Sequence, residues 1–241
     1  MSEIELPAHL PGPWEAVGEL VELLPADWVL IGGLMVQLHA WEGGMTDVRA
    51  TVDVDVLGEA RPQRALQAID AALVRAGFKP SPPDFDGYAH RYVRDELIVD
   101  VLAPDGIRPP ATLDGSRKAV GVPGGSHALA RAESVTVRIG EHAFMLRRPT
   151  LLGAVLIKAR SLLVHDDPEA QREDLLRLLS LIEDPRTTAA QISRPERGWL
   201  RRAEPQLRLN EPSNLSARDM RRARQALRLL LRSPTDATSP A

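Results

Sequence analysis

The stretch WVLIGGLMVQLHAWEGGMTDVRATVDVDVLG, residues 28–58, joins two apolar runs through a pair of glycines. Residues 28–31 are apolar and too few for a helix, so they predict a short buried strand. Gly32 and Gly33 permit a tight turn and a close approach of backbone to a ligand. Apolar residues then recur at helical spacing over residues 34–41. The stretch predicts strand, glycine turn and helix, whose N-terminus would suit phosphate; a plain strand-to-helix turn is the alternative.

The second half of the stretch alternates between apolar and polar residues, which predicts one strand with two unlike faces. We expect one face to lie on the core, and it carries Val48, Ala50, Val52, Val54 and Val56. The other face carries Arg49, Thr51, Asp53 and Asp55. The two carboxylates would be roughly 7 Å apart along the strand. Such a pair favours a bound cation such as Mg²⁺, and a solvated edge strand is the alternative.

A third carboxylate lies in the segment HRYVRDELIVDVLAP, residues 90–104. This segment predicts two strands joined at Asp95 and Glu96, a link of hairpin length. Asp100 interrupts the apolar run of the second strand, and a buried carboxylate is costly unless it is paired, hydrogen-bonded or bound to a metal. If this strand lies beside the preceding Asp-x-Asp strand, three carboxylates share one sheet face. That arrangement is typical of a two-metal site for phosphoryl chemistry.

Together these residues resemble the nucleotidyltransferase superfamily related to DNA polymerase beta. The shared pattern is Gly32-Gly33, then Arg49-x-Thr51-x-Asp53-x-Asp55, then Asp100. Within the superfamily it most resembles the AbiEii-like branch, which includes toxins of bacterial toxin–antitoxin systems. That branch carries a lysine in one helix and an Asp-Leu pair in the next, matched here by Lys158 and by Asp174-Leu175. The resemblance covers roughly residues 24–185.

The resemblance implies an α/β (α+β) fold, with a small mixed sheet and helices on one face. It also implies transfer of a nucleoside monophosphate from an NTP to an acceptor hydroxyl, with release of pyrophosphate. Asp53 and Asp55 would hold two Mg²⁺ ions, and Asp100 would ligate the catalytic metal and help to activate the attacking oxygen. The implied nucleotide contacts are Gly32, Gly33, Arg49, Thr51 and Lys158, with Asp174 orienting Lys158. A helix-surface role is the alternative for Lys158 and Asp174, and a structural ion pair to Asp53 or Asp100 is the alternative for Arg49.

One departure from the superfamily concerns the glycine turn. Much of the superfamily has Gly-Ser where this chain has Gly32-Gly33, so backbone N–H groups alone would contact a phosphate here. The following segment WEGGMTDV is long and contains glycine. We expect it to form a mobile flap or an acceptor-binding loop.

The amino-acid composition excludes several kinds of chemistry and of protein. The chain has 241 residues and no cysteine, which excludes disulfides, thiolate chemistry and cysteine-ligated metal sites. It shows neither a basic-then-apolar N-terminal signal nor a run of about 18 apolar residues. We therefore expect a cytoplasmic protein without a membrane partner.

Charge is unevenly distributed along the chain. Residues 1–146 carry 12 Lys and Arg against 21 Asp and Glu, a net charge of −9. Residues 147–232 carry 18 against 11, a net charge of +7. An acidic catalytic half followed by a basic half suits a polyanionic partner, tRNA in particular. Arginines that merely decorate solvated helix faces are the alternative.

We expect three segments: a nucleotidyltransferase domain over residues 14–146, a helical domain over residues 147–232 and a disordered tail over residues 233–241. Helices are predicted over residues 13–24, 61–77, 150–163, 168–182 and 216–231. Two strands about Gly140 are expected to close the sheet.

The sequence is compatible with three functions. The first is an RNA-directed toxin that modifies tRNA and is held by a cognate antitoxin protein. The second is a nucleotidyltransferase that acts on a small molecule such as an aminoglycoside. The third is a non-catalytic module that binds a nucleotide or a protein. His90, beside the strand of Asp100, is a candidate for contact with the acceptor.

Overall fold

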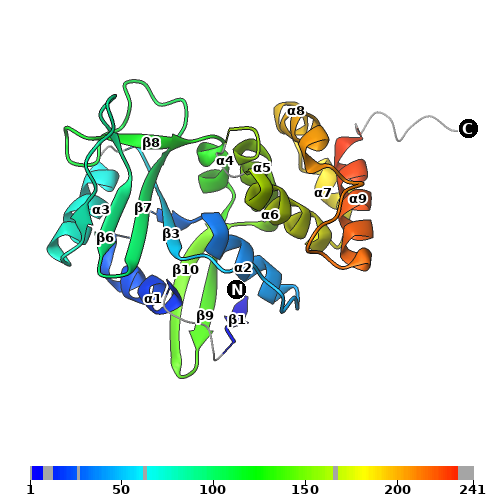
Figure 1. Ribbon diagram of the computed structural model, residues 1–241, viewed down its shortest axis with the longest axis horizontal. Coiled ribbons are helices and arrows are strands. Elements are labelled where there is room, and N and C mark those ends of the chain that lie inside the picture. The colour runs from blue at the N-terminus through cyan, green and yellow to red at the C-terminus, as the bar shows by residue number, and fades with distance from the viewer. Residues whose placement is uncertain (1, 8–12, 26–27, 62–63, 165–167, 233–241) are drawn as a thin grey trace, which may run out of the picture. The chain divides into compact units, whose positions relative to one another are not determined.

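The computed structural model describes residues 2–7, 13–25, 28–61, 64–164 and 168–232 (Figure 1). The chain forms two compact units, Met1–Thr150 and Leu151–Ala241, which we describe separately. The break between them falls at Thr150, four residues after the expected boundary at residue 146. The expected tail, residues 233–241, lies outside the described residues. Helices and mixed sheets make the protein an α+β structure, as predicted.

The first unit is built on a mixed sheet in the order β2-β3-β7-β6-β4. Its central pair is parallel, β3 (Asp53–Gly58) beside β7 (Leu97–Pro104). Two antiparallel neighbours flank this pair, β2 (Trp28–Leu30) on β3 and β6 (Arg91–Arg94) on β7. The shorter strands are β4 (Lys79–Pro80), β5 (Tyr88–Ala89) and β8 (Lys118–Val122), and β8 pairs with both β5 and β7. The Asp-x-Asp strand therefore lies beside the strand of Asp100.

The hairpin between β6 and β7 forms where the sequence predicts it. Its turn consists of Asp95 and Glu96, and Asp95 adopts a left-handed conformation with a φ of 53°. A two-residue turn of this kind fixes the register of the flanking strands. Counting outward from the turn therefore places Arg91 directly opposite Asp100, as observed.

The expected strand over residues 48–56 is too long at its N-terminal end. β3 begins at Asp53, and residues 46–52 have no regular structure. Val52 is 63% exposed, so the expected core face is wrong for the residues before Asp53 and correct only for Val54 and Val56. The cause lies in the neighbouring strand. β7 begins at Leu97, directly after the hairpin turn, so it offers little pairing to residues before Asp53.

Apolar side chains cover the sheet face opposite the carboxylates. On the central strands, Val54, Val56, Val99 and Val101 are fully buried. Helix α3 (Arg64–Arg75) packs here, and a Cβ added to Gly58 would lie 2.6 Å from Leu66. The other helices of this unit are α1 (Pro13–Leu23), α2 (Gly32–Glu42) and α4 (Gly125–Ala130).

The strands about Gly140 do not close this sheet, contrary to expectation. β9 (Ala132–Ile139) and β10 (His142–Pro149) form a separate sheet with β1 (Glu3–Glu5), which runs parallel to β9. The hairpin joins the core through buried side chains, namely Val135, Val137 and Leu146. Because β1 occupies the second edge of β9, strand β9 is paired on both sides without the main sheet.

The described part of the second unit consists of helices. They are α5 (Leu151–Ser161), α6 (Pro168–Leu181), α7 (Pro185–Ala190), α8 (Arg194–Ala203), the 3₁₀ helix η1 (Glu204–Leu207) and α9 (Ala217–Leu231). The three long helices were expected, whereas α7 and α8 were not. Both have sequence-visible caps, Asp184 on α7 and a Ser193/Glu196 capping box on α8. Within the described residues, no helix combines the length and apolarity needed to cross a membrane.

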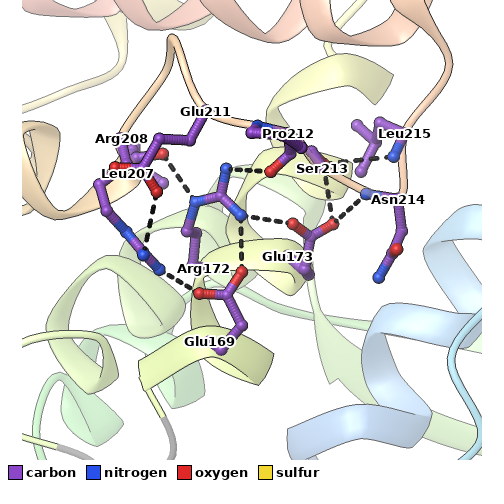
Figure 2. A network of polar contacts seen from close by, with 10 residues as sticks. All are labelled: Glu169, Arg172, Glu173, Leu207, Arg208, Glu211, Pro212, Ser213, Asn214 and Leu215. Carbon is purple, nitrogen blue, oxygen red and sulfur yellow. Dashed lines mark hydrogen bonds and ion pairs between the residues drawn. The ribbon is translucent and has the colours of Figure 1, made fainter.

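A buried arginine organises the segment that leads into α9 (Figure 2). Arg172 on α6 is 1% exposed, and its guanidinium donates to the backbone oxygens of Leu207 and Pro212 at 2.9 and 3.0 Å. It also pairs with Glu173 at 2.6 Å. Glu173 in turn accepts hydrogen bonds from the Ser213 hydroxyl and the Asn214 backbone N–H. This network anchors residues 207–214 to α6.

Candidate active site

Three charged side chains form a row across the central strands of the first unit. Asp55 on β3 lies directly opposite Asp100 on β7, and Arg91 on β6 lies opposite Asp100 on its other side. Asp53, two residues before Asp55, points to the same face of β3. Asp100 is 6% exposed, while Asp53 and Asp55 are half-buried. The predicted convergence of the two strands is therefore confirmed, and all three carboxylates lie on one sheet face.

Arg91 bridges two of these carboxylates. Its Nε donates to Asp100 Oδ1 at 2.9 Å, and its Nη2 donates to Asp100 Oδ2 at 2.8 Å. The same Nη2 lies 3.3 Å from Asp53 Oδ2. Hydrogen bonding to Asp100, together with the charges of Asp100, Asp53 and Asp55, raises the pKa of Arg91 above its usual value. Arg91 is not among the residues predicted from the sequence, although the two-residue hairpin turn fixes its position opposite Asp100.

We call Asp53, Asp55 and Asp100 the carboxylate row. The glycine turn lies against it at Asp55. Gly32 has a φ of +72°, and a Cβ added there would lie 1.7 Å from Asp55 Oδ2. A Cβ on Gly33 would lie 3.0 Å from the Thr51 side chain. Both glycines begin helix α2, whose first N–H groups have no intrahelical partners. The expected grouping of Gly32, Gly33, Thr51 and Asp55 is therefore present.

A chain of hydrogen bonds fixes the irregular segment that carries Thr51. The indole N–H of Trp14 donates to Gln37 Oε1 at 2.9 Å, and Gln37 Nε2 donates to the backbone oxygen of Arg49 at 2.8 Å. Helices α1 and α2 thus hold the entry to β3, although no strand pairing is present there. The exposed Arg49 side chain donates to the backbone oxygen of Ala50 at 3.2 Å.

His90 lies next to the carboxylate row, as its sequence position suggests. Its Nε2 is 4.0 Å from Asp100 Oδ2, and its side chain is 41% exposed. An imidazole so placed reaches both Asp100 and solvent.

Lys158 and Asp174 lie in the second unit and form a buried ion pair. Lys158 Nζ on α5 donates to Asp174 Oδ2 on α6 at 2.8 Å and to Gln171 Oε1 at 3.0 Å. Lys158 is 4% exposed, so the alternative of a helix-surface lysine is wrong. The expected pairing with Asp174 is present, and the expected role of Lys158 toward a nucleotide stays a prediction.

The chemistry of the carboxylate row fits Mg²⁺. Mg²⁺ prefers carboxylate oxygens and keeps positions for water and phosphate, and three carboxylates from adjacent strands supply such oxygens. A cation already neutralises part of the row, since the Arg91 guanidinium contacts Asp53 and Asp100. Within the described ranges, no group of three His, Cys, Asp or Glu side chains is gathered closely enough to hold a metal ion. Asp53, Asp55 and Asp100 are the residues that would hold it.

No protein-family model matches this chain, and no curated protein matches it either. Function is therefore argued from the site itself.

Proposed function

We propose that the first unit is a Mg²⁺-dependent nucleotidyltransferase, which moves a nucleoside monophosphate from an NTP to an acceptor hydroxyl. The observation that carries this proposal is the register of β3 and β7, which sets Asp55 opposite Asp100 with Asp53 on the same face. Asp100 is almost fully buried on that face and pairs with Arg91, whose single positive charge does not balance three carboxylates. Three carboxylates on one face favour binding of divalent cations. Enzymes that transfer phosphoryl groups use such cations to stabilise charge on the phosphates.

The proposed reaction assigns a task to each part of the site. When bound, Mg²⁺ would neutralise the triphosphate charge and polarise the α-phosphorus for attack. The acceptor oxygen forms a bond to the α-phosphorus, the bond between the α-phosphorus and its bridging oxygen breaks, and pyrophosphate leaves with the electron pair. Asp100, the deepest of the three carboxylates, accepts the hydroxyl proton. The N–H groups at Gly32 and Gly33 orient the phosphates, because helix N-termini favour anions.

We propose RNA, tRNA in particular, as the acceptor. Helix α9 of the second unit supports this, because it carries five arginines and a single acidic residue. Arg221, Arg224 and Arg228 recur at i, i+3 and i+7, so they share one exposed face. The acidic residue, Asp219, is engaged with the Ser216 hydroxyl at 2.6 Å. Exposed guanidinium groups in a row suit the phosphates of a nucleic-acid backbone.

The direct test incubates the purified chain with Mg²⁺, each α-labelled NTP in turn and total tRNA. We expect label to enter the RNA with wild-type protein and not with Asp53→Ala, whose circular dichroism should match the wild type. Label entering equally with Asp53→Ala would overturn the proposal. Nucleotide binding without RNA labelling would redirect the search to a small-molecule or protein acceptor.

A further inference from the structure

Arg91 contacts two of the three carboxylates that would hold a divalent cation. It uses both oxygens of Asp100 and one oxygen of Asp53. A metal bridging β3 and β7 requires oxygens from the same two carboxylates. Arginine stays charged at all relevant pH values, so it cannot yield the site by losing a proton. It can only move away.

The position of Arg91 allows such a movement. It lies on the four-residue strand β6, and its side chain is 39% exposed. The Arg91 side chain therefore reaches solvent, whereas the Asp100 side chain that it contacts is only 9% exposed. A planar guanidinium binds phosphate as readily as carboxylate, through the same two-point geometry.

We infer that Arg91 is a resident counter-ion, which metal displaces from Asp53 and Asp100 and which then takes a phosphate of the incoming nucleotide. This inference rests on the proposed function, since it assigns metal and nucleotide to the same row. It makes binding of the two ligands cooperative. Metal alone must displace Arg91, whereas metal with nucleotide offers the displaced guanidinium a new anionic partner, and such coupling is reciprocal.

The test measures Mn²⁺ binding by electron paramagnetic resonance of the full chain, with and without an α,β-methylene NTP. We expect Arg91→Gln to bind Mn²⁺ alone about tenfold more tightly than wild type, because Asp53 and Asp100 lose their counter-ion. The gain in Mn²⁺ affinity that the nucleotide confers should shrink by a similar factor. Unchanged or weaker Mn²⁺ binding by a folded Arg91→Gln protein would overturn the inference.

Three further variants separate the possible outcomes. Arg94→Gln is the matched control, because Arg94 lies on the same strand but pairs with Glu19 at 2.5 Å, and we expect its Mn²⁺ affinity to match the wild type. Arg91→Lys keeps the charge and loses the two-point contact, so it should show an intermediate affinity. If Arg91→Gln does not fold, a wild-type Mn²⁺ affinity in Arg91→Lys overturns the inference. Asp100→Asn tests the site itself: if it leaves Mn²⁺ binding unchanged, the proposed function fails, whereas weaker binding with no effect at Arg91 refutes the inference alone.

Discussion

At the scale of single residues, Arg91 and Asp100 form the centre of the site, joined by two hydrogen bonds of 2.9 and 2.8 Å. An aspartate within an apolar run, such as Asp100, must be compensated, so its importance is visible in the sequence. Arg91 is one of many arginines, and only its register opposite Asp100 distinguishes it. The sequence offered Arg49 as the neighbour of the carboxylates because it precedes them in the chain. The structure adds Arg91, which reaches them across the sheet.

Gly32 should be the least replaceable residue of the glycine turn. Gly32→Ala places a methyl group on Asp55 Oδ2 and also strains a backbone φ of +72°. We expect a loss of about 2–4 kcal/mol in the free energy of unfolding, or displacement of Asp55 with loss of nucleotide binding. Gly44→Ala is the control, since Gly44 has a φ of +76° but nothing within 4 Å of the added Cβ. Urea denaturation should show a clearly smaller loss for Gly44→Ala, and equal losses would refute the steric explanation.

His39 should make stability depend on pH. Burial, the charge of Arg148 and the contact of Nε2 with the Pro149 oxygen together set its pKa at about 3, and burial is the largest cause of the lowering. In the unfolded chain His39 takes up a proton as the pH falls below 6.5, whereas in the folded chain it stays neutral. Its contribution to the free energy of unfolding is therefore fully present above pH 6.5 and is lost as the pH falls below that value. Between pH 7.5 and 5.5 this costs about 1.4 kcal/mol. In urea denaturation, the free energy of unfolding of His39→Gln should fall between pH 7.5 and 5.5 by about 1.4 kcal/mol less than that of the wild type. The same pH dependence in both proteins would contradict the assignment of this effect to His39.

At the scale of elements, local sequence signals predicted part of the structure, although α7 and α8 were missed despite their local caps. The hairpin at Asp95 and Glu96 and the start of α9 at Ser216 lie where turn and capping rules place them. The start of β3 was misplaced because a strand continues only as far as its neighbour does. The separate sheet of β1, β9 and β10 was missed because β1 pairs with a segment about 130 residues away. Periodicity within a segment carries no information about such a partner.

The ion pair between α5 and α6 offers a test of whether Lys158 acts beyond packing. Removing one partner, as in Asp174→Leu, should cost about 3–5 kcal/mol, because it leaves a buried charge uncompensated. The double variant Lys158→Met/Asp174→Leu should cost less in urea denaturation than either single change. We expect this double variant to fold, and its affinity for NTP tests whether Lys158 contacts a nucleotide. NTP affinity equal to the wild type would make the pair purely structural.

The arginine face of α9 should carry RNA affinity. Arg221→Glu/Arg228→Glu reverses two exposed charges on one helix face. We expect tRNA binding to weaken at least tenfold in a filter-binding assay, with a shallower dependence on salt. Arg64→Glu/Arg75→Glu is the control, because it makes the same change in net charge on helix α3 of the acidic unit. Equal losses in the two variants would show a general charge effect and no defined surface.

At the scale of the whole molecule, the uneven charge of the chain follows its division into two units. The acidic unit carries the carboxylate row, and the basic unit carries the arginine-rich α9. Hydrophobic periodicity in the sequence predicted the α+β class, because it is a property of long segments. The boundary fell within four residues of the break at Thr150. Composition could not predict that Arg91 would lie within the acidic row, since that depends on strand order.

The central claim is that Asp53, Asp55 and Asp100 form one site for metal and nucleotide. Isothermal titration of an α,β-methylene NTP into the wild-type chain, with and without Mg²⁺, and into Asp53→Asn with Mg²⁺, tests it most directly. The claim predicts binding that requires Mg²⁺ and that weakens at least tenfold in Asp53→Asn, since the amide removes a charged ligand while keeping its shape. Equal affinity with and without Mg²⁺, or in the variant, would contradict it.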